Sequence, residues 1–243
     1  MNVGAEGNPR RRPSPRHTTG LTGGWFGGLL SFLKESVIVL AIALILSIII
    51  KTFFVQAFYI PSESMENTLQ VGDRLIVNKL KAKETALERG DIVVFVDPGG
   101  WLRVEADEAS GVKRALTWVG LLPEHAHEHL IKRIVGMPGD RVECCDDEGR
   151  LLVNGQPIEE PYIHPDQDPS EKEFSVTVPD SHLWLLGDNR GRSQDSRYSQ
   201  GAVGGGFVPI RNVVGRASFI LWPLDHATTL KTPKDTFAEV PDP

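Results

Sequence analysis

Residues 37–55 are the most apolar stretch of the chain, and they restrict its possible folds more than any other feature. Residues 37–50 are apolar except for Ser47, and Lys51 is the single charged residue of the stretch. An α-helix rises about 1.5 Å per residue, so about 20 residues cross the hydrocarbon core of a bilayer. Residues 37–55 reach this length when the long Lys51 side chain extends to the lipid headgroups. We therefore expect one transmembrane helix over residues 37–55.

Basic residues are unevenly distributed about this stretch. Lys34 and four arginines precede it, whereas after Lys51 the next basic residue is Arg74. Segments rich in Lys and Arg stay on the cytoplasmic side of a membrane. We therefore predict a single-pass protein of the cell membrane, with a cytoplasmic, largely disordered basic tail over residues 1–36. All residues after Val55 are expected to lie outside the cytoplasm.

A cleavable signal peptide is the competing interpretation of the same stretch. Val55-Gln56-Ala57 resembles the small-x-small pattern that precedes a signal cleavage site. The basic segment, however, begins far upstream, and the apolar run is long for the core of a signal peptide. Arg11-Arg12 resembles a twin-arginine signal, but Pro13-Ser14-Pro15 follows it and the apolar core starts too far away. We therefore favour an uncleaved anchor.

The residues after the anchor are predicted to form a β-rich domain. The chain contains 24 Gly and 17 Pro, which indicate many turns. Short runs rich in β-branched residues, bounded by such turn residues, predict strands. These runs are residues 73–78, 91–96, 130–135, 141–145, 151–153, 174–178, 183–186 and 213–221. We therefore expect a mainly β fold of packed antiparallel sheets over residues 56–224.

Two segments interrupt or follow this domain. Residues 97–129 form an irregular insertion, in which the apolar spacing of residues 112–122 predicts a helix that Pro123 ends. This insertion could pack in the body or contact lipid through Trp101, Trp118, Leu121 and Leu122, and we expect packing. Residues 225–243 are expected to form a polar C-terminal tail.

Composition and residue spacing exclude several classes of protein. A formal net charge of −6 and a pI near 5.7 leave no basic footprint for nucleic acid, so no such partner is expected. Cys144 and Cys145 are the only cysteines and are adjacent, so we expect no disulfide framework, and their oxidation state stays open. His125, His127 and His129 alternate as metal ligands in a strand would, but no cysteine lies nearby. We expect a solvated loop there, and neither a metal nor another cofactor.

Two residues form the most reactive pattern: Ser64, in the polar segment after the anchor, and Lys132, in an apolar strand. Taken alone, Ser64 is compatible with a helix cap, and Lys132 with the solvent face of an edge strand. Strand alternation, however, places Lys132 on the same face as Leu130 and Ile134 and puts Arg133 on the other. Apolar surroundings penalise the charged amine and lower its pKa from about 10.4 toward neutrality. A neutral lysine can take the proton of a serine hydroxyl, and serine–lysine pairs are a known catalytic variant.

Five ordered segments together carry a family resemblance. They are Pro61-Ser62-Glu63-Ser64-Met65 followed by Thr68-Leu69; Gly72-Asp73 through Val77-Asn78-Lys79; Arg89-Gly90-Asp91-Ile92-Val93-Val94-Phe95; Lys132-Arg133-Ile134-Val135-Gly136-Met137-Pro138-Gly139-Asp140; and Gly187-Asp188-Asn189-Arg190 through Ser193-Gln194-Asp195-Ser196-Arg197. In this order they resemble the type I signal peptidases, which are membrane-anchored serine–lysine enzymes that cut signal peptides from exported proteins. The resemblance covers about residues 37–222 and implies the same fold and activity, without a cofactor.

The resemblance also implies roles for individual residues. Ser64 would be the nucleophile and Lys132 its general base, and the Ser64 N–H and the Ser62 hydroxyl would form the oxyanion hole. Three further residues would support the base: Ser193 as the hydroxyl that orients the amine, and Asp195 and Arg197 as a structural ion pair beneath the site. A simple polar turn is the alternative interpretation of Asp195 and Arg197.

Substrate selection is a further implication of the resemblance. The family selects small residues at positions −1 and −3 of preprotein signal peptides, and membrane lipid and the secretion translocon are further candidate partners. The matching positions suggest shallow apolar pockets lined by Phe58, Ile60, Pro61, Met65, Leu69, Leu75 and Ile131. One excess methylene costs about 1–3 kcal/mol in such a pocket, so its size is a modest filter. The family usually has proline before Thr68-Leu69, and Asn67 in its place suggests a looser turn without loss of a catalytic group.

Two alternative functions are weighed against this one. A self-cleaving repressor-type protease uses a similar pair, but a DNA-binding domain is expected where this chain has its anchor. A catalytically silent homologue would bind preproteins as a docking module. The presence of Ser62, Ser64, Lys132 and Ser193 argues against the silent homologue, because loss of any one would have favoured it.

Overall fold

The computed structural model describes residues 24–82, 84–102, 129–164 and 166–243. It divides the chain into two compact units, Met1–Leu46 and Ser47–Pro243. The predicted helix 112–122 and residues 125–128 lie outside the described residues.

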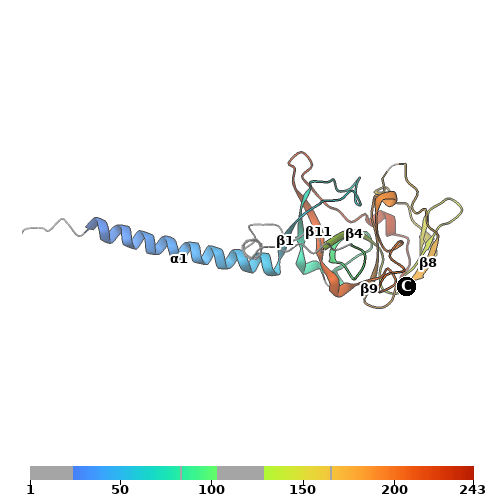
Figure 1. Ribbon diagram of the computed structural model, residues 1–243, viewed down its shortest axis with the longest axis horizontal. Helices are drawn as coiled ribbons and strands as arrows, with labels where there is room; N and C mark the ends of the chain where they lie inside the picture. The colour runs from blue at the N-terminus through green and yellow to red at the C-terminus, as the bar shows by residue number, and fades with distance from the viewer. Residues whose placement is uncertain (1–23, 83, 103–128, 165) are drawn as a thin grey trace, which may run out of the picture. The chain divides into compact units, whose positions relative to one another are not determined.

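The N-terminal helix α1 spans Gly24–Phe53 (Figure 1). Its segment Phe32–Ile50 has a mean hydropathy of 2.5 and is long and apolar enough to cross a membrane. None of that segment is buried against protein, as expected of a helix whose surroundings are lipid. The helix starts before residue 37, because the apolar residues upstream include no proline to end it, and it ends at Phe53. Residues 24–36, predicted to belong to the disordered tail, are therefore helical.

The larger sheet is antiparallel and contains the strands that hold the predicted reactive residues. Its strands are β1 Val55–Tyr59, β2 Arg74–Asn78, β3 Ile92–Val96, β4 His129–Gly136, β9 His182–Leu186, β10 Val208–Pro209, β11 Val213–Trp222 and β12 Thr228–Thr229. The order across the sheet is β1-β2-β11-β3-β4-β9-β10, with β12 paired to β11. Figure 1 shows β4 in the interior of the body, between β11 and β9.

A smaller antiparallel sheet packs at the other side of the body. It consists of β5 Arg141–Cys144, β6 Leu151–Val153, β7 Gln156–Pro157 and β8 Phe174–Thr177, in the order β7-β6-β5-β8. The described residues also form five short 3-10 helices: η1 Lys79–Lys81, η2 Glu84–Ala86, η3 Arg190–Arg192, η4 Ile210–Asn212 and η5 Lys234–Phe237. All strand pairs among the described residues are antiparallel, which confirms the predicted mainly β fold.

Strand β4 is buried on both faces. It pairs with β3, where Val93 lies opposite Lys132, and with β9, where Leu186 lies opposite Arg133. Both charged residues are only 2 % exposed. The alternative that Lys132 occupies the solvent face of an edge strand is therefore wrong.

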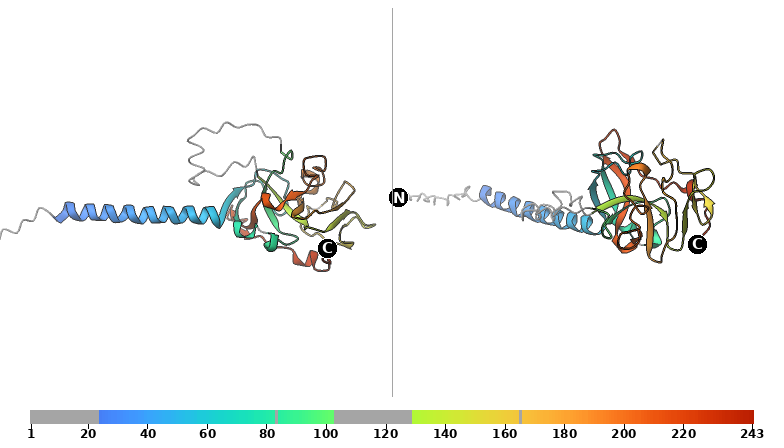
Figure 2. Two further views of the ribbon diagram at one scale, coloured as in Figure 1. Left: turned by 90° about the horizontal axis from the view of Figure 1, so that it is seen from below. Right: turned by 45° about the vertical axis from the view of Figure 1, so that its right-hand side comes forward.

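The C-terminal segment is packed, which corrects the expectation of a polar tail over residues 225–243. Leu230, Phe237 and Val240 are buried in the apolar clusters, and β12 extends the larger sheet. The Thr232 hydroxyl donates to the Asp91 carboxylate over 2.6 Å. The last residue, Pro243, lies against Gly139, so the chain ends beside the smaller sheet (Figure 2). Apolar residues at irregular spacing gave no periodic signal for this packing.

Two smaller expectations are resolved in the body. Trp101 is 5 % exposed and packs edge-on against the Phe95 ring, so it lies in the core rather than in lipid. Cys144 and Cys145 are joined by a disulfide. This bond links neighbours and closes no loop between distant segments, so the chain has no disulfide framework among its described residues.

Candidate active site

The Ser64 turn, which we name the nucleophile turn (residues 61–69), begins just after β1 and is fixed by apolar anchors. Met65 and Leu69 have no exposed surface, and the Leu69 N–H donates to the Met65 carbonyl over 2.8 Å. Ser64 itself is 6 % exposed. Residues 61–69 form turns that lead into β2, so the alternative role of Ser64 as a helix cap is wrong.

Lys132 extends from β4 to the Ser64 hydroxyl. Its Nζ lies 2.7 Å from Ser64 Oγ and donates a second hydrogen bond to the Ile131 carbonyl over 2.9 Å. The amine has little access to water because Lys132 is 2 % exposed. The structure therefore brings the two predicted reactive residues into direct contact.

Burial lowers the pKa of the Lys132 amine from its ordinary value of 10.5 to about 8, because the charged form is costly away from water. The Asp195 and Asp188 carboxylates oppose this shift, and the Arg197 guanidinium adds to it. A substantial fraction of the amine is neutral near pH 8 and has a free lone pair. In that state the Ser64 hydroxyl donates to Nζ, and the proton is already placed for transfer.

The lowered pKa of Lys132 predicts a rise in the free energy of unfolding between about pH 8 and 10.5. Below pH 8 both the folded and the unfolded state hold the proton, so the full cost of the buried charge is present. Between the two pKa values only the unfolded lysine keeps its proton, so stability increases with pH, by about 3 kcal/mol in total. Urea unfolding of wild type and Lys132→Met across this range measures the difference. Parallel stability curves for the two proteins would contradict the lowered pKa.

Ser193 lies at the site but does not make its predicted contact. Its Oγ is buried without a hydrogen-bond partner, because the Lys132 amine donates to Ser64 and to the Ile131 carbonyl instead. The neighbouring Gly187 is required for space, since a Cβ there would collide with Ser193 Oγ and with the Ser64 carbonyl. Orientation of the amine by Ser193 is therefore not seen in this arrangement.

Asp195 and Arg197 form the predicted ion pair. The Arg197 Nε and Nη2 donate to the two Asp195 oxygens over 2.9 and 2.7 Å, and both side chains are fully buried. Asp195 also accepts from the Gly187 N–H over 3.1 Å, and Arg197 donates to the Arg190 carbonyl over 2.8 Å. The pair thus closes the segment that we name the catalytic loop (residues 187–197), and the polar-turn alternative is wrong.

A second buried ion pair was missed by the sequence reasoning. Arg133 donates to both Asp188 oxygens over 2.8 and 2.6 Å and to the Gly90 carbonyl over 2.7 Å. The Thr68 hydroxyl in turn donates to Asp188 over 2.5 Å. Because Arg133 follows Lys132 on β4, one strand holds the nucleophile turn at two points. The available signal was a second basic residue in an apolar strand.

The catalytic loop also contacts the nucleophile turn through Asn189. Its N–H donates to the Ser64 carbonyl over 3.1 Å, and its side-chain amide donates to the Glu66 carboxylate over 3.2 Å. Arg192 and Glu63 form an exposed ion pair nearby. These contacts fix the backbone on both sides of the Ser64 hydroxyl.

The seven predicted pocket residues are only partly accessible. All except Pro61, which is exposed, belong to one apolar cluster beside the nucleophile turn: Phe58, Ile60, Met65, Leu69, Leu75 and Ile131. Met65, Leu69 and Leu75 have no exposed surface, so they form the floor beneath the surface. Phe58 and Ile131, each 7 % exposed, are the members that reach it.

Asn67 does not loosen the turn, contrary to the expectation. It has a φ of 87°, in the left-handed region, which a proline ring cannot adopt. Its side-chain amide donates to the Tyr162 and Ile163 carbonyls over 3.1 and 2.9 Å.

Ser62 is exposed next to Ser64, and its role in an oxyanion hole stays a prediction.

The described residues contain no group of His, Cys, Asp and Glu able to hold a metal ion. His129 is the one member of the predicted histidine motif that the structure describes, and its ring lies 5.2 Å from the Phe58 ring. His125 and His127 lie outside the described residues.

Comparison with known proteins identifies the family to which this chain belongs. The family described as "Signal peptidase, peptidase S26" matches residues 33–222. A probable signal peptidase I of Mycobacterium leprae is 37% identical over 79% of this chain and 77% of its own length. The signal peptidase I of Mycobacterium tuberculosis is 37% identical over 79% and 74%. The signal peptidase I of Leptolyngbya laminosa is 36% identical over 83% and 85%. The chain therefore belongs to the S26 signal peptidases and is a serine endopeptidase of the signal peptidase I type.

Proposed function

We propose that this protein is a membrane-bound endopeptidase that removes signal peptides from exported preproteins through a Ser64–Lys132 dyad. The observation that carries the proposal is the 2.7 Å contact between Lys132 Nζ and Ser64 Oγ on a lysine that is 2 % exposed. Burial keeps a substantial fraction of the Lys132 amine neutral near pH 8, and its position beside Ser64 Oγ places it within reach of the proton that it must take. No metal or cofactor takes part in the proposed chemistry.

The reaction has two halves that use the same base. Neutral Lys132 takes the Ser64 proton while Oγ attacks the scissile carbonyl carbon, and the Ser64 N–H and the Ser62 hydroxyl stabilise the oxyanion. When the C–N bond breaks, the lysine ammonium gives its proton to the leaving amine. An ester on Ser64 and a neutral lysine remain. Lys132 then takes a proton from water, the resulting hydroxide attacks the ester, and the proton returns to Ser64 Oγ.

Cleavage after small residues at −1 and −3 is part of the proposal. Support comes from the apolar cluster beside the nucleophile turn, where Phe58 and Ile131 are each 7 % exposed while Met65 and Leu69 are fully buried. A larger side chain at either position would have to displace Met65 or Leu69 from a close-packed core, which costs several kcal/mol. We expect the extended backbone of the signal peptide to supply the remaining binding energy.

The apolar helix α1 is the basis for the proposed location of the enzyme. We infer a single pass through the cell membrane by α1, with residues 1–36 facing the cytoplasm and the β-rich body outside. The proposed partners are preprotein signal peptides and membrane lipid, with the secretion translocon as a further candidate. No nucleic acid is expected, given the net charge of −6.

Preprotein cleavage by the detergent-solubilised full chain tests the proposal. Wild type is expected to cut after a small-x-small site, with the new N-terminus read by mass spectrometry. Ser64→Ala is expected to lower cleavage at least a thousandfold. Replacing the −1 alanine of the substrate by phenylalanine should abolish cleavage by wild type. Cleavage that survives in Ser64→Ala overturns the mechanism, and preprotein binding without any cleavage by wild type favours the docking module.

A further inference from the structure

Residues 160–164 lie in the connection between β7 and β8 of the smaller sheet and contact three separate parts of the site. Glu160 and Tyr162 are each 8 % exposed, although both carry polar groups. None of the five family segments includes these residues. Their contacts reach the nucleophile turn, strand β4 and the catalytic loop.

Tyr162 supports the Arg133 guanidinium. The Arg133 Cζ lies 3.9 Å from the centre of the Tyr162 ring, which is a close cation–π contact. The Tyr162 hydroxyl donates to Glu160 Oε1 over 2.7 Å. Burial raises the pKa of Tyr162 well above 10, so the phenol stays neutral and remains a donor. The Tyr162 ring therefore packs against the flat face of the Arg133 guanidinium, out of the plane of its hydrogen bonds.

Glu160 connects this ring to the catalytic loop. It accepts from Arg190 Nη1 over 3.0 Å and from Arg190 Nη2 over 2.6 Å, and both side chains are 1 % exposed. Arg190 Nε donates to the Gly187 carbonyl over 2.9 Å. Gly187 is the residue whose Cα faces the Ser64 carbonyl. Through Arg190, Glu160 thus fixes the backbone of the loop at a residue that lies against the Ser64 carbonyl.

Three hydrogen bonds that involve the backbone of this segment complete the set. The Asn67 amide donates to the Tyr162 and Ile163 carbonyls over 3.1 and 2.9 Å, and the His164 N–H donates to the Asp188 carbonyl over 3.0 Å. Asn67 can make its bonds because its φ of 87° turns the side chain toward this segment. The segment is therefore attached at once to the turn that carries Ser64 and to the loop that carries Asp188.

We propose that Glu160, Tyr162 and Asn67 form a brace that positions the nucleophile turn against the Lys132 strand. The brace touches no reacting atom. It acts through Arg133, whose bidentate pair with Asp188 holds Thr68, and through the catalytic loop, whose Asn189 holds the Ser64 carbonyl. Displacement of a reacting group by about 1 Å can lower a rate about a hundredfold, so a loose brace lowers kcat more than substrate binding. The inference rests on the proposed Ser64–Lys132 dyad.

The test compares Tyr162→Phe, Tyr162→Leu and Asn67→Gly in the full chain in detergent. Tyr162→Phe keeps the ring under Arg133, so kcat is expected within about threefold of wild type. Tyr162→Leu removes the ring and is expected to lower kcat tenfold to a hundredfold, with KM within about threefold. Asn67→Gly keeps the positive φ but removes both amide bonds at an exposed position, and about a tenfold loss of kcat is expected.

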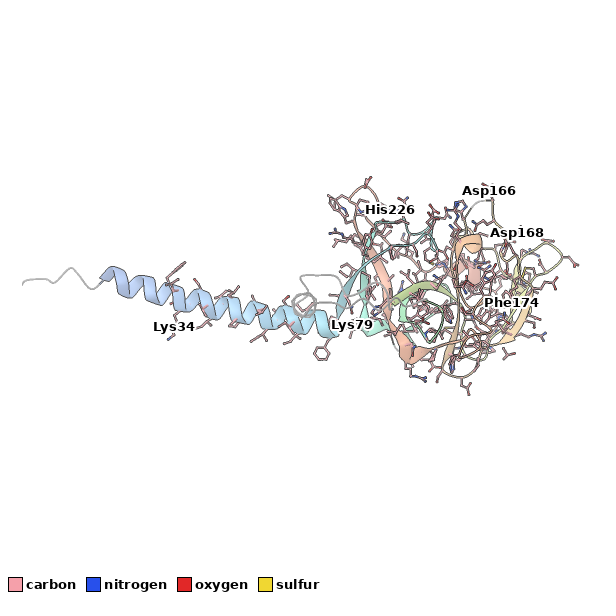
Figure 3. All side chains as sticks on the ribbon, viewed as in Figure 1. Lys34, Lys79, Asp166, Asp168, Phe174 and His226 are labelled. Atoms are coloured by element: carbon pink, nitrogen blue, oxygen red, sulfur yellow. A yellow bond between two sulfur atoms is a disulfide. The ribbon has the colours of Figure 1, made fainter. Side chains whose placement is uncertain are left out.

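Phe174→Leu is the matched control for packing. Phe174 is also 8 % exposed, lies in the smaller sheet and is labelled in Figure 3 at the side of the body that carries β8. The Phe174→Leu variant loses a ring that is as buried as the ring of Tyr162. It is expected to change the urea midpoint as much as Tyr162→Leu does, while its kcat stays that of wild type. Equal losses of kcat in these two variants, or unchanged kcat in both Asn67→Gly and Tyr162→Leu, would refute the brace. Cleavage that persists in the Ser64→Ala variant would instead refute the proposed dyad. Failure of the brace and failure of the dyad are therefore distinguishable.

Discussion

Replacing Lys132 by methionine is expected to lower preprotein cleavage at least a thousandfold while the fold stays intact. The thioether has nearly the length of the lysine stem but no lone pair able to take the proton of the Ser64 hydroxyl, whose Oγ lies 2.7 Å from Nζ in the wild type. Members of a catalytic dyad act as a unit, so loss of the base costs about as much as loss of the nucleophile. Initial rates on one preprotein, measured for Lys132→Met and Ser64→Ala together, check this.

The same substitution is expected to raise stability at pH 7. Removing a buried amine whose pKa has been lowered from 10.5 to about 8 relieves up to about 3 kcal/mol. Lys231→Met, at an exposed position, is the control and should change neither activity nor the urea midpoint by a measurable amount. Near-normal cleavage by Lys132→Met would rule out the lysine as the base.

Asp195→Ala is expected to destabilise the protein by about 3–5 kcal/mol. It leaves the Arg197 guanidinium fully buried without the carboxylate that now accepts two of its hydrogen bonds. The double variant Asp195→Leu with Arg197→Met removes both charges and is expected to recover most of the loss. Urea unfolding of the single and double variants measures both values. A single variant within 1 kcal/mol of wild type would show that the pair contributes little.

Asp195→Ala also has an expected effect on the pH profile. The Asp195 carboxylate raises the pKa of Lys132, whereas Arg197 lowers it, so loss of Asp195 lowers the pKa further below 8. The acid limb of kcat/KM, which reports the base in the free enzyme, should therefore move to lower pH. Remaining activity is expected to fall because the catalytic loop loses its closure. An acid limb that moves to higher pH would contradict this electrostatic account.

The fold was predictable wherever hydrophobic pattern alone decides structure. Helix α1 followed from an unbroken apolar run, because a segment of that length and composition has few stable alternatives to a helix in lipid. The longer strands followed from β-branched runs between turn residues. The two-residue strands β7, β10 and β12 carry no such pattern, because two residues are too few to show alternation. The packed C-terminal segment was missed because its apolar residues lie at irregular spacing.

The site was partly predictable. Alternation along β4 separated Lys132 from Arg133, and the order of the polar segments suggested Ser64 as its partner. Sequence did not indicate that β4 is a central strand, and this position in the sheet removes water from the amine and lowers its pKa. The sequence also gave no indication that Ser193 would lie at the site without a hydrogen bond to the Lys132 amine.

The sequence by itself therefore determined the anchor, the β-rich class and the reactive pair. Each of these depends on residue chemistry and short-range periodicity, which the chain carries wherever it folds. The tertiary structure decided the Arg133–Asp188 clamp and the hydrogen bonds of Asn67 to Tyr162 and Ile163, which join residues between 55 and 96 positions apart. Such contacts arise only when the two sheets pack, because a charged group that is removed from water is stable only beside a partner.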